Sequence, residues 1–298
     1  MNRYGGREAV RGHLAMLAFS ALVGGSFSFG GLMANDIAPV VLQALRFGIA
    51  SVTVGIVALA TGRMRGGDFR APWRYVLLGG TFAIYFVAMF EGLKTAPPVS
   101  ASAVMTLMPI MTAFFGWLIL RQIASRRTAA ALAVGAAGAL WVIFRGDPAR
   151  LMSFDVGRGE MVYFGGCIAH ALYVPLARKL SRGEAAVTSS SLVLGAGAVL
   201  LVLWGWDEIR ATDFAALRPI VWVAVAYLSF GAMSITFVLL NFASMRLASA
   251  KVLAYTYLTP GWVILWELAF GHGLPGAMVL PGVALTFVAL AMLLRHEG

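Results

Sequence analysis

Apolar runs of about 20 residues with few or no charges recur along the whole chain, and no other feature of the sequence restricts its fold so strongly. A helix needs roughly 20 apolar residues to cross a hydrocarbon core of about 30 Å. Of the 298 residues, 60% are apolar and 12% are charged, whereas about a quarter of the residues of a soluble domain are charged. We therefore expect the bilayer to be the solvent, and an all-α integral membrane protein to be the fold class.

Ten such runs, separated by charge, glycine and proline, predict ten transmembrane helices. The predicted spans are 13–33, 38–60, 74–94, 99–120, 128–144, 160–177, 187–206, 219–241, 250–270 and 277–294. The first run has no cleavage site of the A-x-A type, so we expect it to be retained as a helix rather than removed as a signal peptide. No connecting segment exceeds about 15 residues, which leaves no room for a soluble domain.

The basic residues are unevenly distributed between the two ends of the predicted spans. With the N-terminus inside, 16 of the 23 Lys and Arg residues lie on the inner side and six at the outer ends, while Arg46 lies within a span. Because positive residues concentrate on the cytoplasmic side, we expect both termini in the cytoplasm. The net charge of +10 does not predict nucleic-acid binding, since the basic residues form no single patch. The expected partners are the lipid bilayer and a small-molecule substrate, and the oligomeric state is left undefined.

Two similar motifs indicate an internal duplication, for which chance coincidence is the alternative. Thr106-Leu107-Met108-Pro109 and Tyr257-Leu258-Thr259-Pro260 each lie within a predicted span, with their prolines 151 residues apart, and Gly135 and Gly282 are 147 residues apart. Five spans in each half place the second half in the opposite orientation, as in the inverted repeats of transporters. The predicted divisions are a cytoplasmic N-terminus (1–12), a first five-helix repeat (13–145), an external linker (146–158), a second five-helix repeat (159–294) and a cytoplasmic C-terminus (295–298).

The second to fourth spans carry motifs in a recognisable order: Ala44-Leu45-Arg46-Phe47, Gly92-Leu93-Lys94-Thr95-Ala96, Ser100-Ala101-Ser102-Ala103 and Met108-Pro109. This order resembles the first repeat of the drug/metabolite transporter superfamily and, more narrowly, the EamA-type ten-helix exporters. Within that group the chain is most similar to bacterial exporters of aromatic and other neutral amino acids. The resemblance implies a secondary transporter of the bacterial inner membrane that exports such amino acids by alternating access. The chain departs from many relatives in lacking a glutamate near Gln122 or His272, and a second Arg-Phe pair.

Ionisable side chains within spans are candidates for function, because each costs about 2.5 to 3.5 kcal/mol or more at the helix centre. Arg46 and Glu91 lie at comparable predicted depth, so we expect them to form an ion pair that locks two helices or an external gate. Glu267, on the same helix face as Pro260, and His170 are candidates for proton coupling. The alternative for Glu267 is a carboxylate that reaches the outer interface, and the alternative for His170 is a hydrogen bond to a neighbouring helix.

A set of aromatic, sulfur-containing and polar side chains on shared helix faces is predicted to line a substrate cavity near the midplane. The set is Tyr85, Met89, Met108, Tyr163, His170, Tyr173, Ser234, Phe237, Asn241 and Tyr257. Hydroxyls and amides suit the backbone of a zwitterion and the rings suit its side chain, although packing against protein or lipid is the alternative. Pro109 and Pro260 each leave a carbonyl without its helical partner, which predicts hinges beside the cavity.

No enzyme motif accompanies these features: the sequence has no H-E-x-x-H, no phosphate loop ending in G-K-[ST], no C-x-x-C and no G-x-S-x-G. We therefore expect no catalytic residue, no metal and no cofactor, and a source of energy other than ATP. One alternative to amino-acid export is the export of drugs or other amphiphilic metabolites by the same fold. A second is a polytopic membrane enzyme, which the scattered positions of the acidic residues disfavour.

Overall fold

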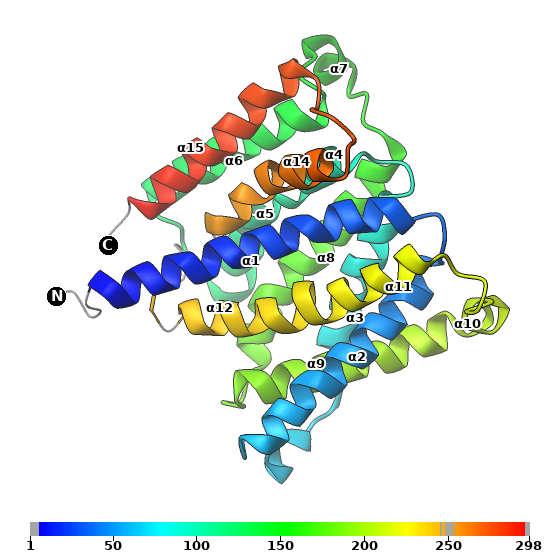
Figure 1. The fold of residues 1–298 in the computed structure, drawn as a ribbon. Coiled ribbons are helices and arrows are strands. Elements are labelled where there is room, and N and C mark those ends of the chain that lie inside the picture. The colour runs from blue at the N-terminus through cyan, green and yellow to red at the C-terminus, as the bar shows by residue number, and fades with distance from the viewer. Residues whose placement is uncertain (1–5, 245, 248–251, 253, 296–298) are drawn as a thin grey trace.

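The computed structural model describes residues 6–244, 246–247, 252 and 254–295, and this part of the chain forms a bundle of helices without a strand (Figure 1). The first half contains α1 (Gly6–Met33), α2 (Pro39–Ala60), α3 (Trp73–Gly92), α4 (Pro98–Met105), α5 (Met108–Leu120) and α6 (Arg126–Ile143). The second half contains α8 (Arg158–Leu180), α9 (Ala186–Trp204), α11 (Pro219–Ala226), α12 (Thr236–Ser244), α14 (Thr259–Ala269) and α15 (Leu280–Leu294). The expectation of an all-helical membrane fold is confirmed.

Eight helical segments of the described residues are long and apolar enough to cross a membrane, and they correspond to eight of the ten predicted spans. The other two are α8 and the segment that ends in α14. α8 has 23 residues but carries charges near both ends, and it packs against α3, α4 and α5. A helix surrounded by other helices needs less apolar surface than one that faces lipid on most sides.

Prolines and one glycine set several helix boundaries. Pro39, Pro98 and Pro219 stand at the first turns of α2, α4 and α11, where the missing N–H group has no helical partner in any case. α14 ends just before Gly271, whose φ of +80° favours a residue without a Cβ atom. The turn chemistry of the sequence therefore places these ends within a few residues of the predicted ones.

The two repeated motifs interrupt their helices in the same way. α4 ends at Met105 and α5 begins at Met108, so that Pro109 lies in the first turn of a new helix. A 3₁₀ turn over Tyr255–Leu258 precedes α14, and Pro260 lies in the first turn of that helix. Each proline thus lies in the first turn of a helix, where its ring does not clash with a preceding helical turn.

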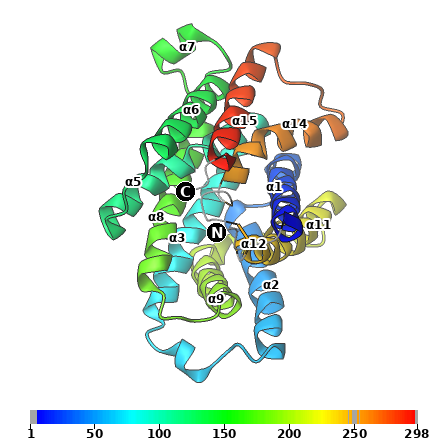
Figure 2. The same cartoon turned by 90° about the vertical axis from the view of Figure 1, so that its left-hand side faces the viewer.

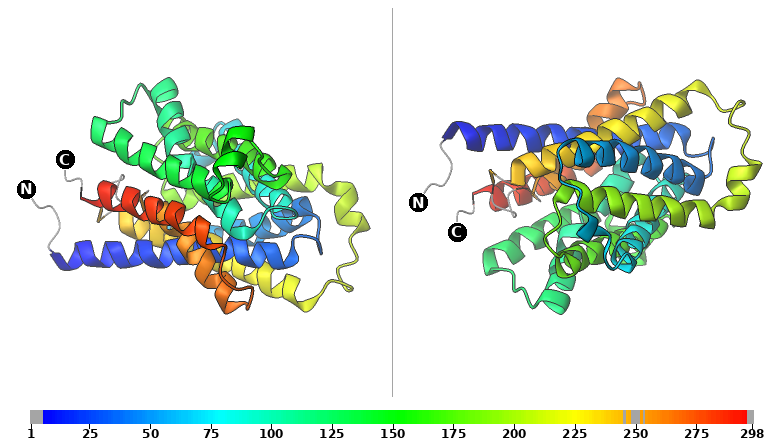
Figure 3. Two further views of the ribbon diagram at one scale, coloured as in Figure 1. Left: turned by 90° about the horizontal axis from the view of Figure 1, so that it is seen from above. Right: turned by 90° about the horizontal axis from the view of Figure 1, so that it is seen from below.

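The contacts between helices show that the two halves are related by an approximate two-fold arrangement. α2 packs against α9 and α6 against α15, each helix meeting its counterpart (Figures 1 and 2). The contact of α3 with α8 is matched by that of α12 with α1, and the contact of α5 with α8 by that of α14 with α1 (Figure 3). Both described chain ends, Gly6 and Arg295, lie on one side of the bundle, which we call the terminal side (Figure 1).

Glycines allow the closest approaches between the halves. A Cβ atom on Gly79 of α3 would lie 2.6 Å from the backbone nitrogen of Gly197 on α9. A Cβ atom on Gly138 of α6 would lie 2.6 Å from the carbonyl oxygen of Gly282 on α15. In a membrane, where packing rather than water exclusion drives helix association, such contacts hold helices together.

Three local features were not predicted. The segment between α11 and α12 is a π-helical turn over Tyr227–Ile235, with nine residues. Two short helices lie in the connections, α7 (Pro148–Ser153) and α10 (Trp206–Ala211). π-Helical turns are rare and frequently occur at functional sites, and this one contacts α2 beside Arg46.

Candidate functional site

Arg46 of α2 is completely buried at the interface of the two halves. Its Nη1 atom donates to the Gln43 side-chain oxygen at 3.0 Å, and its Nη2 atom makes a long contact of 3.5 Å with the Leu228 carbonyl oxygen of the π-helical turn. The guanidinium carbon lies 4.7 Å from the centre of the Phe86 ring and 5.2 Å from that of Phe90. Aromatic faces stabilise a desolvated cation by about 2 kcal/mol, so α3 holds this charge without neutralising it.

Two hydrogen-bond donors at Arg46 have no acceptor among the described residues: its own Nε atom and the side-chain nitrogen of Gln43. The hydroxyl group of Ser229, the residue after Leu228 in the π-helical turn, also has no partner there. No carboxylate of the described residues lies within ion-pair distance of Arg46, whose side chain appears in none of the observed salt bridges. A buried cation with unsatisfied donors on both sides is a site that an anionic group would complete.

An aromatic cluster lies next to Arg46, between α3 and α8. The Tyr85 hydroxyl is 2.9 Å from the Tyr163 hydroxyl, and both groups are buried. The His170 ring lies 4.6 Å from the Tyr85 ring, and the Phe82 ring stacks on the Tyr173 ring at 5.0 Å, measured between centroids. The structure therefore brings together four of the predicted cavity residues, from two helices and both halves.

Met89, Met108, Ser234, Phe237 and Asn241 were also predicted to line the cavity. Met89 and Met108 are buried in the same hydrophobic core. The Ser234 hydroxyl donates to the Ser229 carbonyl at 2.9 Å within the π-helical turn, and Phe237 is half-buried on α12. Asn241 belongs to α12, but its side chain lies outside the described residues.

Tyr257 lies apart from the aromatic cluster. Its ring is completely buried in a second hydrophobic cluster with Leu132 of α6 and Leu290 of α15, and a Cβ atom on Gly135 would collide with it. The periodicity of the ninth span placed Tyr257 on the face of Pro260, but the break before α14 turns the preceding 3₁₀ segment toward α6 and α15. Its hydroxyl group has no hydrogen-bond partner within the described structure.

The expected ion pair between Arg46 and Glu91 is not formed. Glu91 pairs with Lys94 at 2.7 Å on a partly exposed helix end, while Arg46 contacts Gln43 and the rings of Phe86 and Phe90. The two residues are on different helices, and comparable depth does not give them a common face. A gating role for either residue stays a prediction.

Sequence reasoning missed the residues that surround Arg46. Phe82, Phe86 and Phe90 recur every four residues on one face of α3, and Gln43 precedes Arg46 by three. Side chains at these spacings lie on one helix face, so the signal was present in the sequence. It did not show that α3 directs this face toward α2.

Glu267 and His272 form a second polar contact, far along the chain from Arg46. The Nδ1 atom of His272 lies 2.8 Å from the Glu267 Oε2 atom, and the other carboxylate oxygen is buried without a partner. Both residues border a pocket of about 400 Å³ on the side of the bundle opposite the termini. The structure thus retains Glu267 as a candidate for interaction with a proton or a cation.

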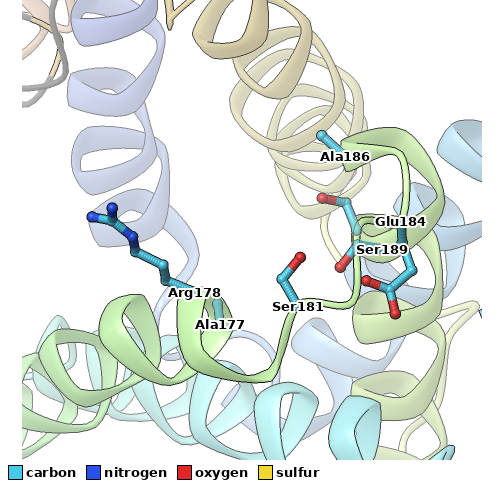
Figure 4. Close-up of a pocket in the computed structure, with 7 residues that line it drawn as sticks. Ala177, Arg178, Ser181, Glu184, Ala186 and Ser189 are labelled. Carbon is cyan, nitrogen blue, oxygen red and sulfur yellow. The ribbon is translucent and has the colours of Figure 1, made fainter. Parts of the chain in front are cut away.

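On the terminal side, a pocket of about 550 Å³ opens between the end of α8 and the start of α9. Figure 4 shows Arg178 on one side of it, Glu184 and Ser189 on the other, and Ser181 between them. The Glu184 carboxylate forms an ion pair of 2.7 Å with Arg74 of α3, and the exposed fractions of the two side chains are only 5% and 3%. Burial raises the pKa of Glu184, but the backbone N–H of Arg182 and the Arg74 guanidinium outweigh it and lower the pKa to about 2. We interpret this pair as a structural bond between α3 and the α8–α9 connection.

Two contacts close the terminal side between α1 and the second half. The Arg246 side chain, beyond α12, bonds to the Glu8 carboxylate of α1 at 2.8 Å. The His13 Nδ1 atom lies 2.8 Å from the Tyr255 hydroxyl. Both contacts join α1 to residues of the second half.

The described residues contain no group of three or more His, Cys, Asp or Glu side chains that could hold a metal ion. The arrangement is instead a buried cation with free donors, an aromatic cluster at its side and closing contacts at one end. Among the described residues, these features are those of a small-molecule site rather than of a metal site.

Comparisons with known proteins agree with this interpretation. The model of the EamA-like transporter family matches residues 10–144 and 157–295, one segment in each half. The protein named "Uncharacterized transporter YyaM" of Bacillus subtilis (strain 168) is 23% identical over 265 residues, which cover 88% of this chain and 86% of that protein. A crystal structure described only as that of a protein has a TM-score of 0.68 and 22% identity, covering 96% of each chain. At that identity the structural likeness shows the fold alone.

Proposed function

This chain belongs to the EamA-like transporter family, and we propose that it exports small neutral metabolites, above all aromatic and other apolar amino acids. Membership establishes a multi-pass membrane transporter rather than an enzyme. The substrate class is our inference from the site. We further propose the bacterial inner membrane as its location, with the terminal side in the cytoplasm, because most basic residues lie on that side.

The observation that carries the substrate proposal is the environment of Arg46. Its charge is buried beside Gln43, and neither the Arg46 Nε atom nor the Gln43 side-chain nitrogen has an acceptor within the described residues. A substrate carboxylate would accept from the guanidinium in the bidentate geometry that arginine favours. A halide or phosphate would meet the same donors but would gain nothing from the neighbouring rings.

The aromatic cluster supplies the second part of the recognition. Tyr85, Tyr163, His170 and Tyr173 form a ring-lined surface between α3 and α8. Aromatic rings prefer offset or edge-to-face contacts with other rings, worth about 0.5 to 1.5 kcal/mol beyond the area they bury. A molecule with a carboxylate near Arg46 and an aromatic side chain against this surface uses both features, as an aromatic amino acid does.

Transport would proceed by rocking the two halves about this site. The contacts of Glu8 with Arg246 and of His13 with Tyr255 close the terminal side. On the opposite side, Arg218 bonds to Asp36 through two nitrogens. We infer that these two sets of contacts form and break in alternation, while Pro109 and Pro260 allow the broken helices to bend. Downhill export and proton antiport both fit this scheme.

The test is uptake of labelled phenylalanine into proteoliposomes that contain the purified protein, with empty liposomes as the reference. We expect protein-dependent flux that unlabelled neutral amino acids reduce by competition. Repeating the measurement with an imposed pH gradient decides between downhill export and proton coupling. Folded protein that produces no such flux, but that transports an amphiphilic cation lacking a carboxylate, would refute the amino-acid proposal and favour the export of drugs.

A further inference from the structure

The pocket opposite the terminal side contains polar atoms that the proposed transport site does not use. It has a volume of about 400 Å³, within the range of about 300 to 1,000 Å³ of small-molecule sites. Ser28 and Leu32 line it from the end of α1, Leu93 from the end of α3, Pro98 from the start of α4, and Glu267 and His272 from the end of α14. Four helices from both halves therefore meet around one opening.

Two acceptor atoms in this pocket are buried without a partner among the described residues. The Glu267 residue is 8% exposed, and its Oε1 atom has no hydrogen-bond partner, while its Oε2 atom contacts His272 at 2.8 Å. Ser28 is 1% exposed, and its hydroxyl oxygen is also unpartnered. A hydrogen-bond donor, preferably a charged one, would satisfy both acceptor atoms.

The surrounding helix ends favour a positive charge. α1, α3 and α14 all end at this pocket, and only α4 begins there. A helix C-terminus carries roughly half a negative elementary charge. Arg218 already donates to the Leu32 carbonyl at the end of α1, and Lys94, which follows α3, is paired with Glu91 at 2.7 Å. Among the described residues that line the pocket, His272 is the one basic side chain, so the helix ends there favour a further cation.

The composition of the pocket selects an organic cation rather than a metal ion. Calcium and magnesium need about six oxygen ligands, whereas this pocket offers one carboxylate and one hydroxyl group from side chains. Leu32, Leu93 and Pro98 supply apolar surface instead. An alkyl or aryl ammonium ion combines a charged donor with an apolar body, which matches both parts of the lining.

We propose that this pocket binds the ammonium group of a soluble organic amine, with Glu267 as the counter-ion and Ser28 as a second acceptor. The ammonium group donates to Glu267 Oε1 and to Ser28 Oγ, and its apolar body lies against Leu32, Leu93 and Pro98. The site needs no carboxylate on the ligand, so the proposal stands independently of the amino-acid assignment. For a zwitterionic substrate, it supplies a contact on the side of the bundle opposite the termini.

The test is calorimetric titration of the purified full-length protein in detergent with 2-phenylethylamine. We expect saturable binding, weakened at least tenfold by Glu267→Gln and several-fold by Ser28→Ala. Glu208→Gln, which removes an exposed carboxylate of α10 outside the pocket, is the matched control and should leave the affinity unchanged. 3-Phenylpropanoate, which has the same ring and a carboxylate but no amine, should not compete.

Either of two results overturns the proposal: no saturable binding of 2-phenylethylamine to folded wild-type protein, or equal affinity in the wild type and in folded Glu267→Gln. Thermal unfolding and gel filtration establish that each variant is folded, and Ser28→Ala takes the place of Glu267→Gln if the latter does not fold. Amine binding without phenylalanine flux would retain this site and refute the proposed substrate. Phenylalanine flux without amine binding would support the proposed substrate and refute this site.

Discussion

The hydroxyl groups of Tyr85 and Tyr163 lie 2.9 Å apart and join α3 of the first half to α8 of the second. Both are buried, so neither hydroxyl group has access to water in this arrangement. A hydrogen bond across the interface of the two halves holds them together only while that interface is closed.

Removal of either hydroxyl group of this pair leaves the other buried and unpartnered. We expect Tyr85→Phe and Tyr163→Phe each to lower the free energy of unfolding by about 1 to 3 kcal/mol. The double variant should be more stable than the sum of the single changes predicts, since no orphaned hydroxyl group remains. Unfolding in detergent measures all three, with Tyr173→Phe as the control because its hydroxyl group makes no described hydrogen bond. Simple additivity would contradict a direct bond.

We expect Arg46→Gln to reduce transport without reducing the stability of the protein. A hydrogen bond between a charged side chain and a substrate carboxylate contributes about 1.5 to 3 kcal/mol to the binding free energy. Without it, the transport efficiency for phenylalanine should fall roughly 10- to 150-fold. Stability should be unchanged or higher, because the variant removes a buried charge that has no carboxylate partner. Arg46→Lys keeps the charge but not the planar fork and should be intermediate. Reduced stability with unaltered transport would assign Arg46 a structural role instead.

Glu184→Gln should destabilise the terminal side of the bundle. It leaves the guanidinium of Arg74 buried without its carboxylate, which costs about 3 kcal/mol. Because the pKa of Glu184 in the folded protein is lowered to about 2, the ion pair contributes fully at neutral pH. This contribution is lost as the pH falls below the ordinary carboxyl range toward 2. Unfolding free energies of wild type and variant should therefore converge in acid. Asp155→Asn, which alters an exposed pair with Arg150, should change stability by less than about 1 kcal/mol.

His170→Ala and Tyr257→Ala should have different effects although both residues were predicted to line the cavity. His170 contacts the Tyr85 and Tyr173 rings beside Arg46, so its loss should weaken the apparent affinity for phenylalanine. Tyr257 fills a cluster between α6 and α15, and its truncation should lower the unfolding free energy by about 3 to 5 kcal/mol through the cavity that it leaves. Transport assays on equal amounts of folded protein, together with unfolding curves, distinguish these outcomes. A loss of affinity in Tyr257→Ala at normal stability would return that residue to the cavity.

The site was partly predictable because its components follow local rules. The α-helical period placed Tyr163, His170 and Tyr173 on one face of α8 before any partner was known, and in the structure Tyr163 and His170 contact Tyr85, while Tyr173 contacts His170. Charge within an apolar run identified Arg46 as costly and hence as a candidate. What the ring face of α3 packs against, and which rings contact Arg46, depends on contacts between residues far apart in the chain.

Hydrophobic length, proline position and basic flanks act within about 20 residues of chain, so the sequence alone predicts the membrane environment and the spans, and the repeated motifs predict the duplication. Which side chains contact one another depends on the fold. It gave Glu91 to Lys94 rather than to Arg46, directed Tyr257 toward α6 and α15, and turned three helix ends toward Glu267. The reason is physical: each partner is chosen by how helices rotate and cross when they pack, and small residues such as Gly138 and Gly282 fix those crossings through contacts between the two halves.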